Sequence, residues 1–141
     1  DSLYYGAYPS WNADFNAQGT GIGVRIIPLD RWVGLYPQDK IGQVTFKPWH
    51  IESGSHLTLN ADASEGELQV EWLDASGYRI QGFTQTDGHP LKGDQLEHRP
   101  RWKTPNPSGS ASKTPSGMAQ LRVHLQGATL YAGSLHPPKA E

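Results

Sequence analysis

The sequence has no cysteine, few charged residues and no long apolar run. Without cysteine the chain cannot form a disulfide, a thiolate metal site or a thiol nucleophile. Charged residues make up only 18% of the 141 residues, and the formal net charge is −2. We therefore expect no nucleic acid and no membrane as partner, because both favour a clustered basic surface or a long apolar segment. The given residues also contain no signal-peptide pattern.

Amphipathic helix patterns are missing as well, whereas apolar and polar residues alternate with a period of two along much of the chain. This alternation predicts strands over residues 22–26, 32–36, 44–46, 57–59, 68–72, 80–83 and 121–125, and a last strand from residue 130. Turn-forming residues separate several of them, at 62–66, at 74–77 and at Gly127. Short strands with frequent turns predict an all-β fold, an antiparallel, jelly-roll-like β-sandwich with little or no helix.

One stretch breaks the alternation for longer. Residues 104–117 are rich in proline, serine and glycine and have no apolar period, but strand-like sequence resumes after them. We therefore expect a long flexible surface loop inside a single domain of residues 1–141, and not a linker between two domains.

Patterns that would hold a metal ion or perform catalysis are weak. Asn60, Asp62 and Ser64 alternate as in a calcium loop, but strands flank them, so a turn explains them better. We expect no cofactor, while structural calcium bound by oxygen atoms from separate loops stays open. None of the six histidines has a compact zinc-binding spacing. His89 and His98 lie among charged residues, which predicts a surface ion network, with a ligand-binding loop as the alternative.

The five tryptophans have different surroundings. Trp72 is in phase with the apolar residues of its strand and is expected in the core, and Trp102 is expected to pack beneath a loop. Trp11 lies in a polar, glycine-rich segment, beside asparagine and aspartate. This is the composition of a sugar site, because the ring stacks on a pyranose while short polar side chains bond its hydroxyl groups. The alternative is a tryptophan that folds back over the end of the sandwich.

The expected carbohydrate-binding residues therefore combine aromatic rings with polar side chains. Tyr4, Tyr8 and Trp49 would stack on sugar rings together with Trp11, and hydrogen bonds would come from Asn12, Asp14, Arg25 and His50. If the polymer is sulfated or uronic, as in marine algal glycans, Arg25 would pair with its anionic groups. One or two stacked rings in open water predict an affinity of roughly micromolar to millimolar.

The linked order of several motifs carries a resemblance. They are GIGVRIIPLDRWVGL, VTFKPWHI, LTLNADASEGELQVEWLDASGYRIQGF and LRVHLQGATLYAGSL. Over nearly its whole length the chain resembles a recurrent β-sandwich domain of extracellular bacterial proteins that process glycans. That domain typically follows a five-bladed β-propeller related to glycoside hydrolase families 32, 43 and 68. The most specific parts are L-x-L-N-A-D, G-x-L-x-V-E-x-L-D and the closing L-x-V-H-L with LYAG.

The resemblance has consequences for catalysis and for the N-terminal residues. The family's catalytic carboxylates belong to the propeller, and none carries over to this chain. Residues 1–12 would be the remnant of a junction to an upstream catalytic domain. The chain departs from the family in Trp49 and Trp72, where relatives commonly have aliphatic residues, and in the extra segment 104–117.

Residues and resemblance together predict a noncatalytic carbohydrate-binding module. It would be extracellular and bacterial, and would hold an attached polysaccharide-degrading enzyme on a polysaccharide or oligosaccharide. A second hypothesis is an accessory sandwich that supports a glycoside hydrolase propeller and exposes an apolar patch when isolated. A third is a small polysaccharide lyase or hydrolase that uses the segment 89–101.

Overall fold

The computed structural model describes residues 2–7, 21–26, 29–103 and 114–139, with side chains from residue 29 onward. These residues form the strands β1 Ser2–Ala7, β2 Gly21–Ile26, β3 Ile41–Thr45, β4 Trp49–Ile51, β5 His56–Asp74, β6 Leu91–His98, β7 Gly117–Gln126 and β8 Thr129–His136. All pairings between them are antiparallel. The described part of the chain has no helix, and therefore none that is long and apolar enough to span a membrane. The all-β, antiparallel class predicted from the sequence is confirmed.

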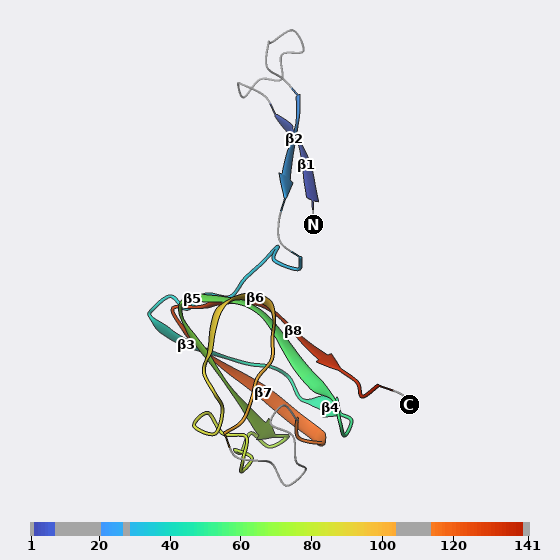
Figure 1. The fold of residues 1–141 in the computed structure, drawn as a ribbon, viewed down its shortest axis with the longest axis vertical. Helices are drawn as coiled ribbons and strands as arrows, with labels where there is room; N and C mark the ends of the chain where they lie inside the picture. Colours follow the sequence, from blue (N-terminus) through green and yellow to red (C-terminus); the bar gives the residue numbers. More distant parts are fainter. Residues whose placement is uncertain (1, 8–20, 27–28, 104–113, 140–141) are drawn as a thin grey trace.

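The first two strands form a sheet of their own. β1 pairs with β2 from Ser2 opposite Ile26 to Ala7 opposite Gly21. Figure 1 shows this hairpin apart from the other strands, joined to them by the segment that leads into β3. An isolated two-stranded hairpin is at best marginally stable in water, so its stability depends on further contacts.

The other six strands form one sheet around β5, which is 19 residues long. β6 lies along one edge of β5, and β8 and β7 lie in succession along the other edge. β3 and β4 pair in turn with the far edge of β7. The strands on both sides of residues 104–113 therefore belong to the same sheet.

The turn predicted at 62–66 is wrong, because β5 continues through these residues. The residues of β5 that belong to the hydrophobic core are odd-numbered as far as Ala63 and even-numbered from Leu68 to Trp72. Between these two residues the register against β6 shifts, since Ala63 lies opposite Gly93 and Leu68 opposite Leu91. The extra residues of this bulge keep both halves of β5 facing the same core. A break in the alternation was thus correctly located, but it marks a bulge and not a reversal.

The turn predicted at Gly127 is wrong for a related reason. β7 and β8 pair with successive parts of β5, and both run antiparallel to it. Gly127 has a φ of 55°, a left-handed value that glycine adopts at little cost, and it bends the chain without reversing it. The bend faces the bulge of β5, because a Cβ atom at Gly127 would lie 3.1 Å from the carbonyl oxygen of Glu65.

The core consists of the inward side chains of both halves of this sheet. The predicted inward residues Leu57, Leu59, Leu68, Val70, Trp72, Phe83, Leu121, Val123 and Leu125 are all buried, as expected. Trp72 is only 1% exposed and meets the Trp49 ring edge-on at a centroid distance of 6.4 Å. The Phe46 and Trp49 side chains reach across to β8, where a Cβ atom at Gly133 would lie 3.9 Å from each ring. Two parts of the sheet thus pack face to face, which is consistent with the predicted sandwich.

The turn predicted at 74–77 is confirmed. The Asp74 side chain accepts hydrogen bonds from the N–H groups of Ser76 and Tyr78, and Gly77 has a φ of 87°. The chain then returns along β5, where the Trp72 N–H donates to the Phe83 carbonyl at 3.0 Å. Trp102, which was expected to pack beneath a loop, is buried, and its ring meets Phe83 edge-on at 5.2 Å.

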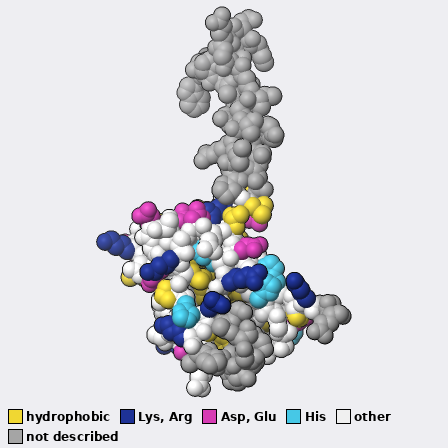
Figure 2. Space-filling model, viewed as in Figure 1, with side chains coloured by type: hydrophobic (Ala, Val, Ile, Leu, Met, Phe, Trp, Pro, Cys, Tyr) yellow, Lys and Arg dark blue, Asp and Glu magenta, His cyan; other side chains and the backbone are white. Residues whose placement is uncertain are grey.

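The strand predicted at 32–36 is wrong. Leu35 forms only an isolated bridge with Leu130, and the rest of the segment is not paired as a strand. The hydrophobic side chains of this segment are therefore at the surface. We call Leu29, Trp32, Val33, Leu35 and Tyr36 the apolar strip; each is at least half exposed. Figure 2 shows hydrophobic side chains on the end of the sheet where the chain enters from β2.

Candidate functional site

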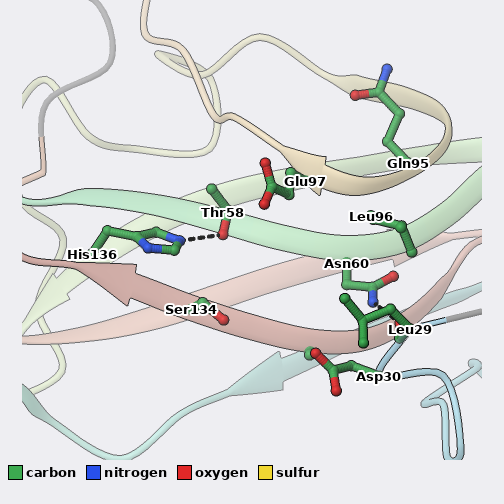
Figure 3. A pocket seen from close by; sticks show the side chains of 10 residues that line it. Leu29, Asp30, Thr58, Asn60, Gln95, Leu96, Glu97, Ser134 and His136 are labelled. Atoms are coloured by element: carbon green, nitrogen blue, oxygen red, sulfur yellow. Dashed lines mark hydrogen bonds between the residues drawn. The ribbon is translucent and has the colours of Figure 1, made fainter. Parts of the chain in front are cut away.

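One polar hollow of about 540 Å³ opens between β5, β6, β8 and the segment before β3. Its lining combines amides, hydroxyl groups, carboxylates and an imidazole with a few aliphatic side chains. The lining residues are Leu29, Asp30, Thr58, Asn60, Gln95, Leu96, Glu97, Ala132, Ser134 and His136. Figure 3 shows Thr58 and His136 at one end of this hollow and Leu29, Asp30 and Asn60 at the other.

Arg31 fixes the wall formed by the segment before β3. Its side chain is only 8% exposed and forms an ion pair of 2.5 Å with Asp94. The guanidinium group also donates to Asn60 Oδ1 at 2.8 Å and to the carbonyl oxygens of Ala61 and Gln95, each at 3.3 Å. A guanidinium group suits this task, because its donors form a rigid planar fork. One side chain thus ties the incoming segment to β5 and β6.

Asn60 completes this attachment from the β5 side. While its carbonyl oxygen accepts from Arg31, its amide nitrogen donates to the carbonyl oxygen of Leu29 at 2.8 Å. The Arg31 guanidinium also lies 4.7 Å from the centre of the Tyr131 ring, within the range of a cation–π contact. Asp30, between the two anchored residues, has a φ of 56°. No local pattern predicted this cluster, because Arg31 and Asn60 are 29 positions apart.

The other end of the hollow contains His136, which is in contact with a second histidine. His136 Nε2 lies 2.9 Å from Thr58 Oγ1, and the His136 ring stacks on His56 at a centroid distance of 4.6 Å. Burial lowers the pKa of His56 below its usual value, and the positive charges of His136, Arg99 and Lys139 lower this pKa further. His56 is thus favoured in its neutral form, which keeps a donor and an acceptor on its ring.

The hollow offers more hydrogen-bonding groups than its internal bonds consume. Gln95, Glu97 and Ser134 have exposed side chains that border it. Leu29 and Leu96, 55% and 44% exposed, add apolar surface at its edge. Among the described residues no three or more histidines, aspartates or glutamates are grouped so as to hold a metal ion. The exposed amide, carboxylate and hydroxyl groups of the lining are able to form hydrogen bonds with a ligand that carries several hydroxyl groups.

A second, shallower hollow of about 570 Å³ lies at the bulge of β5. Its lining residues are Tyr36, Lys40, Glu65, Gly66, Glu67, Lys92, Gln126 and Gly127. Lys92 and Glu67 face each other across 3.9 Å, so part of this charge is already paired. Tyr36 is 62% exposed and supplies one aromatic ring to a mostly charged surface.

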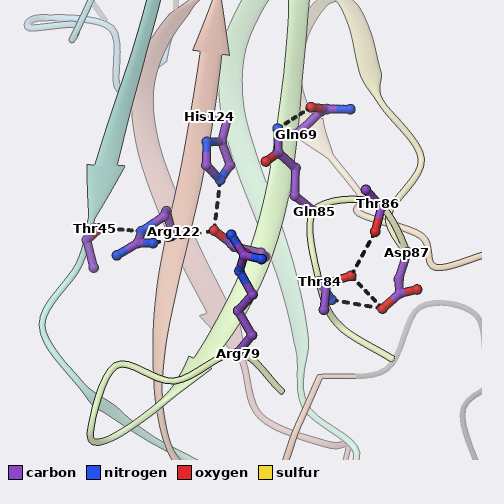
Figure 4. Close-up of polar contacts among 10 residues, drawn as sticks. Thr45, Gln69, Arg79, Thr84, Gln85, Thr86, Asp87, Arg122 and His124 are labelled. Atoms are coloured by element: carbon purple, nitrogen blue, oxygen red, sulfur yellow. Dashed lines mark hydrogen bonds and ion pairs between the residues drawn. The ribbon is translucent and has the colours of Figure 1, made fainter. Parts of the chain in front are cut away.

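A separate polar cluster surrounds Glu71 on β5. This carboxylate is only 2% exposed; it accepts a hydrogen bond from His124 Nε2 at 2.9 Å and lies 3.6 Å from Arg122 and 3.8 Å from Arg79. Figure 4 shows Arg79, Arg122 and His124 close to one another, and Thr45, which accepts from Arg122 Nε at 3.0 Å, beside Arg122. The His124 side chain is 20% exposed and bonds to Glu71 on the polar side of its strand.

The residues predicted to bind carbohydrate are spread over the chain. Tyr8, Trp11, Asn12 and Asp14 lie outside the described residues. Tyr4 and Arg25 occupy neighbouring pairs of the β1–β2 hairpin, with Tyr4 opposite Val24 and Arg25 opposite Leu3.

Trp49 and His50 are adjacent on β4 and have different surroundings. The Trp49 ring is half-buried and contacts Phe46 at 5.6 Å as well as Trp72, whereas His50 is exposed. Since successive side chains of a strand point to opposite faces, these two residues do not form one surface. Neither of them lines the polar hollow.

The segment 89–101 is mostly strand and not loop, because it contains β6. His98 was expected in a surface ion network, but it is only 2% exposed and its Nε2 donates to the Ala61 carbonyl oxygen at 3.1 Å. His89 precedes β6 and is exposed. The two imidazoles therefore do not meet on one surface.

Comparison of the chain with protein-family models, with curated proteins and with solved structures finds no match. The family suggested by the motif order therefore stays a prediction.

Proposed function

We propose that this chain is a noncatalytic carbohydrate-binding module and that the polar hollow is a binding site for its glycan. The observation that carries the proposal is the convergence of amide, hydroxyl, carboxylate and imidazole groups from separate strands on one hollow of about 540 Å³. This volume lies within the range of small-ligand sites, about 300–1,000 Å³. Following the resemblance, the module belongs to an exported bacterial enzyme that degrades polysaccharides.

The chemistry of the lining suits a sugar. Hydroxyl groups both donate and accept hydrogen bonds, so they pair with the Gln95 amide, the Ser134 hydroxyl and the Glu97 carboxylate alike. The exposed Leu29 and Leu96 side chains suit the apolar C–H face of a ring. Because the hollow is open to water, we expect dissociation constants of about micromolar to millimolar. Attachment to an enzyme with further contacts would raise the effective affinity.

Affinity electrophoresis through gels that contain single plant or algal polysaccharides tests this function. Retardation by a neutral glycan is expected for the unmodified chain. Ser134→Phe, which fills the hollow from an exposed position, and Gln95→Ala, which keeps the carbonyl that Arg31 uses, should both reduce it. Gln81→Ala is the control, because Gln81 is exposed and does not line the hollow.

The outcomes separate the predicted sites. If Trp11→Ala abolishes retardation while Ser134→Phe leaves it unchanged, the glycan binds at the aromatic segment and not in the hollow. If no polysaccharide in the panel retards the chain, this result contradicts the carbohydrate-binding function itself.

The apolar strip favours a second candidate, an accessory domain that packs against a neighbouring domain of the same enzyme. Trp32, Val33 and Tyr36 are 51%, 77% and 62% exposed, which is unusual for three large side chains within five positions. Full burial of an exposed large side chain contributes about 1.5–3 kcal/mol, and covering the exposed part of each of these three would contribute a fraction of that. In sedimentation velocity, the isolated chain should then self-associate and Val33→Asp should abolish this, whereas Gln38→Asp at an exposed neighbouring position should not. Monomeric behaviour at all concentrations would count against this candidate.

A further inference from the structure

Three strands present a continuous polar surface on the side away from the core. Val44, Val123 and Val70 lie in one row across β3, β7 and β5 and point inward. Paired residues of antiparallel strands share a face, so the neighbouring rows point outward. We call these rows, Gln43, His124 and Gln69 together with Thr45, Arg122 and Glu71, the outer polar face.

The outer polar face carries more positive than negative charge. The Glu71 carboxylate is shared by Arg122 and Arg79, the latter on the strand-like return after the 74–77 turn. Two guanidinium groups therefore face one carboxylate, and the Arg79 side chain is 74% exposed. Its separation of 3.8 Å from Glu71 leaves its donors open toward solvent.

Glu71 is placed to hold these cations and not to bind a ligand itself. It is buried, and its Oε2 accepts no hydrogen bond from the described residues. A buried oxygen in this state destabilises the fold, because it has lost its bonds to water. The ion pair with Arg122 and the hydrogen bond from His124 offset part of that destabilisation. The same two contacts hold both side chains in place. Preorganised donors bind an anion more strongly, because less side-chain entropy is lost on binding.

Amide and hydroxyl groups frame the two arginines. Gln43 and Thr45 are exposed on β3, and the Gln69 carbonyl oxygen accepts from the Gln85 amide at 2.5 Å, which brings the 80–88 loop to the edge of this face. Figure 4 shows Gln69 and Gln85 together beside Arg79, Arg122 and His124. Amides of this kind pair with sugar hydroxyl groups, while guanidinium groups pair with carboxylates.

We propose that the outer polar face binds a uronate residue of an acidic polysaccharide, with Arg79 and Arg122 on its carboxylate and Gln43 on its hydroxyl groups. This inference rests on the proposed function in that the ligand is a glycan, but it concerns a surface separate from the polar hollow. The outer polar face suits an acidic sugar better than nucleic acid, which requires a larger basic surface than two arginines compensated by a glutamate. The polar hollow, lined by Asp30 and Glu97, suits neutral sugars instead.

Titration of the ¹⁵N-labelled chain with a tetragalacturonate tests the proposal, with the same oligomer after reduction of its carboxyl groups as the uncharged probe. Amide resonances of Gln43, Arg122 and His124 should shift with the acidic oligomer and not with the reduced one. Arg79→Gln should weaken binding about tenfold, the effect of losing one charged hydrogen bond. Arg101→Gln removes the same charge from another exposed position and should leave the affinity unchanged.

Arg79 is chosen because its exposed side chain can be replaced without uncovering the core. Equal binding by wild type and Arg79→Gln, equal shifts with the reduced oligomer, or no binding of the acidic oligomer would each overturn the inference. These results do not bear on the proposed site in the polar hollow, which is tested separately with neutral glycans and with Ser134→Phe. Neutral glycans that bind while tetragalacturonate does not would leave the proposed function standing and refute only the uronate site.

Discussion

Gly66 lies so close to Gln126 that a Cβ atom at residue 66 would come within 1.8 Å of the Gln126 carbonyl oxygen. This approach occurs where the bulge of β5 meets the bend between β7 and β8. The contact is with backbone, so a longer side chain cannot be accommodated by a change of rotamer. Both strands have to separate instead, at the point where the sheet changes direction.

Gly66→Ala should therefore destabilise the protein by at least about 2 kcal/mol, the range of mutations that force a backbone shift. Urea unfolding followed by tryptophan fluorescence measures this. Gly77→Ala is the matched control: Gly77 has a φ of 87° but nothing within 4 Å of a Cβ atom, so only the left-handed backbone opposes alanine. That cost is about 1–2 kcal/mol. If Gly66→Ala proves no more harmful than Gly77→Ala, the close approach does not limit this site.

The same region shows what the sequence predicts and what it leaves undecided. Alternation identified the inward residues of β5 and β7 correctly, because burial of one face is a local property of a strand. It could not distinguish a bulge from a turn at 62–66, since Gly66 and its polar neighbours suit both. Whether a bulge or a turn forms depends on Gln126 and Gly127, which contact this stretch although they lie about 60 positions away along the chain.

The candidate sites were harder to predict for a similar reason. The composition around Trp11 predicted a sugar site there, whereas the polar hollow consists of ordinary residues such as Thr58, Gln95 and Ser134. None of these is unusual in its own strand. They become a site only because β5 pairs with β6 on one edge and with β8 on the other. The local sequence pattern does not predict which strands pair with one another when they are far apart along the chain.

Arg31→Lys should weaken the attachment of the segment before β3. Lysine keeps the charge for Asp94, but it lacks the planar fork that also reaches Asn60 and the Ala61 and Gln95 carbonyl oxygens. Lost bonds at a side chain that is 8% exposed predict a cost of about 1–3 kcal/mol in the free energy of unfolding.

Hydrogen exchange locates this effect. The amide of Leu35, bonded to the Leu130 carbonyl oxygen at 2.7 Å, should exchange faster in Arg31→Lys, while that of Phe46, bonded to Leu121, should be less affected. Arg99→Lys makes the same change at an exposed position and is expected to alter neither. Uniform acceleration at Leu35 and Phe46 would mean that Arg31 stabilises the whole sheet and not this segment.

Thr84→Val should reduce the stability of the chain at neutral pH more than in acid. Hydrogen bonds from the Thr84 hydroxyl and backbone N–H groups lower the pKa of Asp87 below its usual value. A carboxyl whose folded pKa is lowered stabilises the fold above its unfolded pKa of about 3.9, and this contribution is lost as the pH falls through the folded pKa. Urea midpoints at pH 7 and pH 2.5 compare the variant with wild type; an equal loss at both values would show that Asp87 titration contributes nothing.

His56 gives a second pH dependence, near neutrality. Burial, the stacked His136 and the charges of Arg99 and Lys139 lower its pKa, so the folded state takes up a proton at lower pH than the unfolded state does. Between the folded pKa and about 6.5, the unfolded state therefore binds more protons, and stability rises with pH. The stabilising effect is complete above about pH 6.5 and declines below it.

Urea midpoints from pH 5 to pH 8 should show this slope in the wild type and a smaller slope in His56→Gln. Arg99→Gln, which removes one of the charges but keeps the imidazole, should give an intermediate slope. Identical slopes in all three proteins would assign the pH dependence to other groups and remove His56 from it.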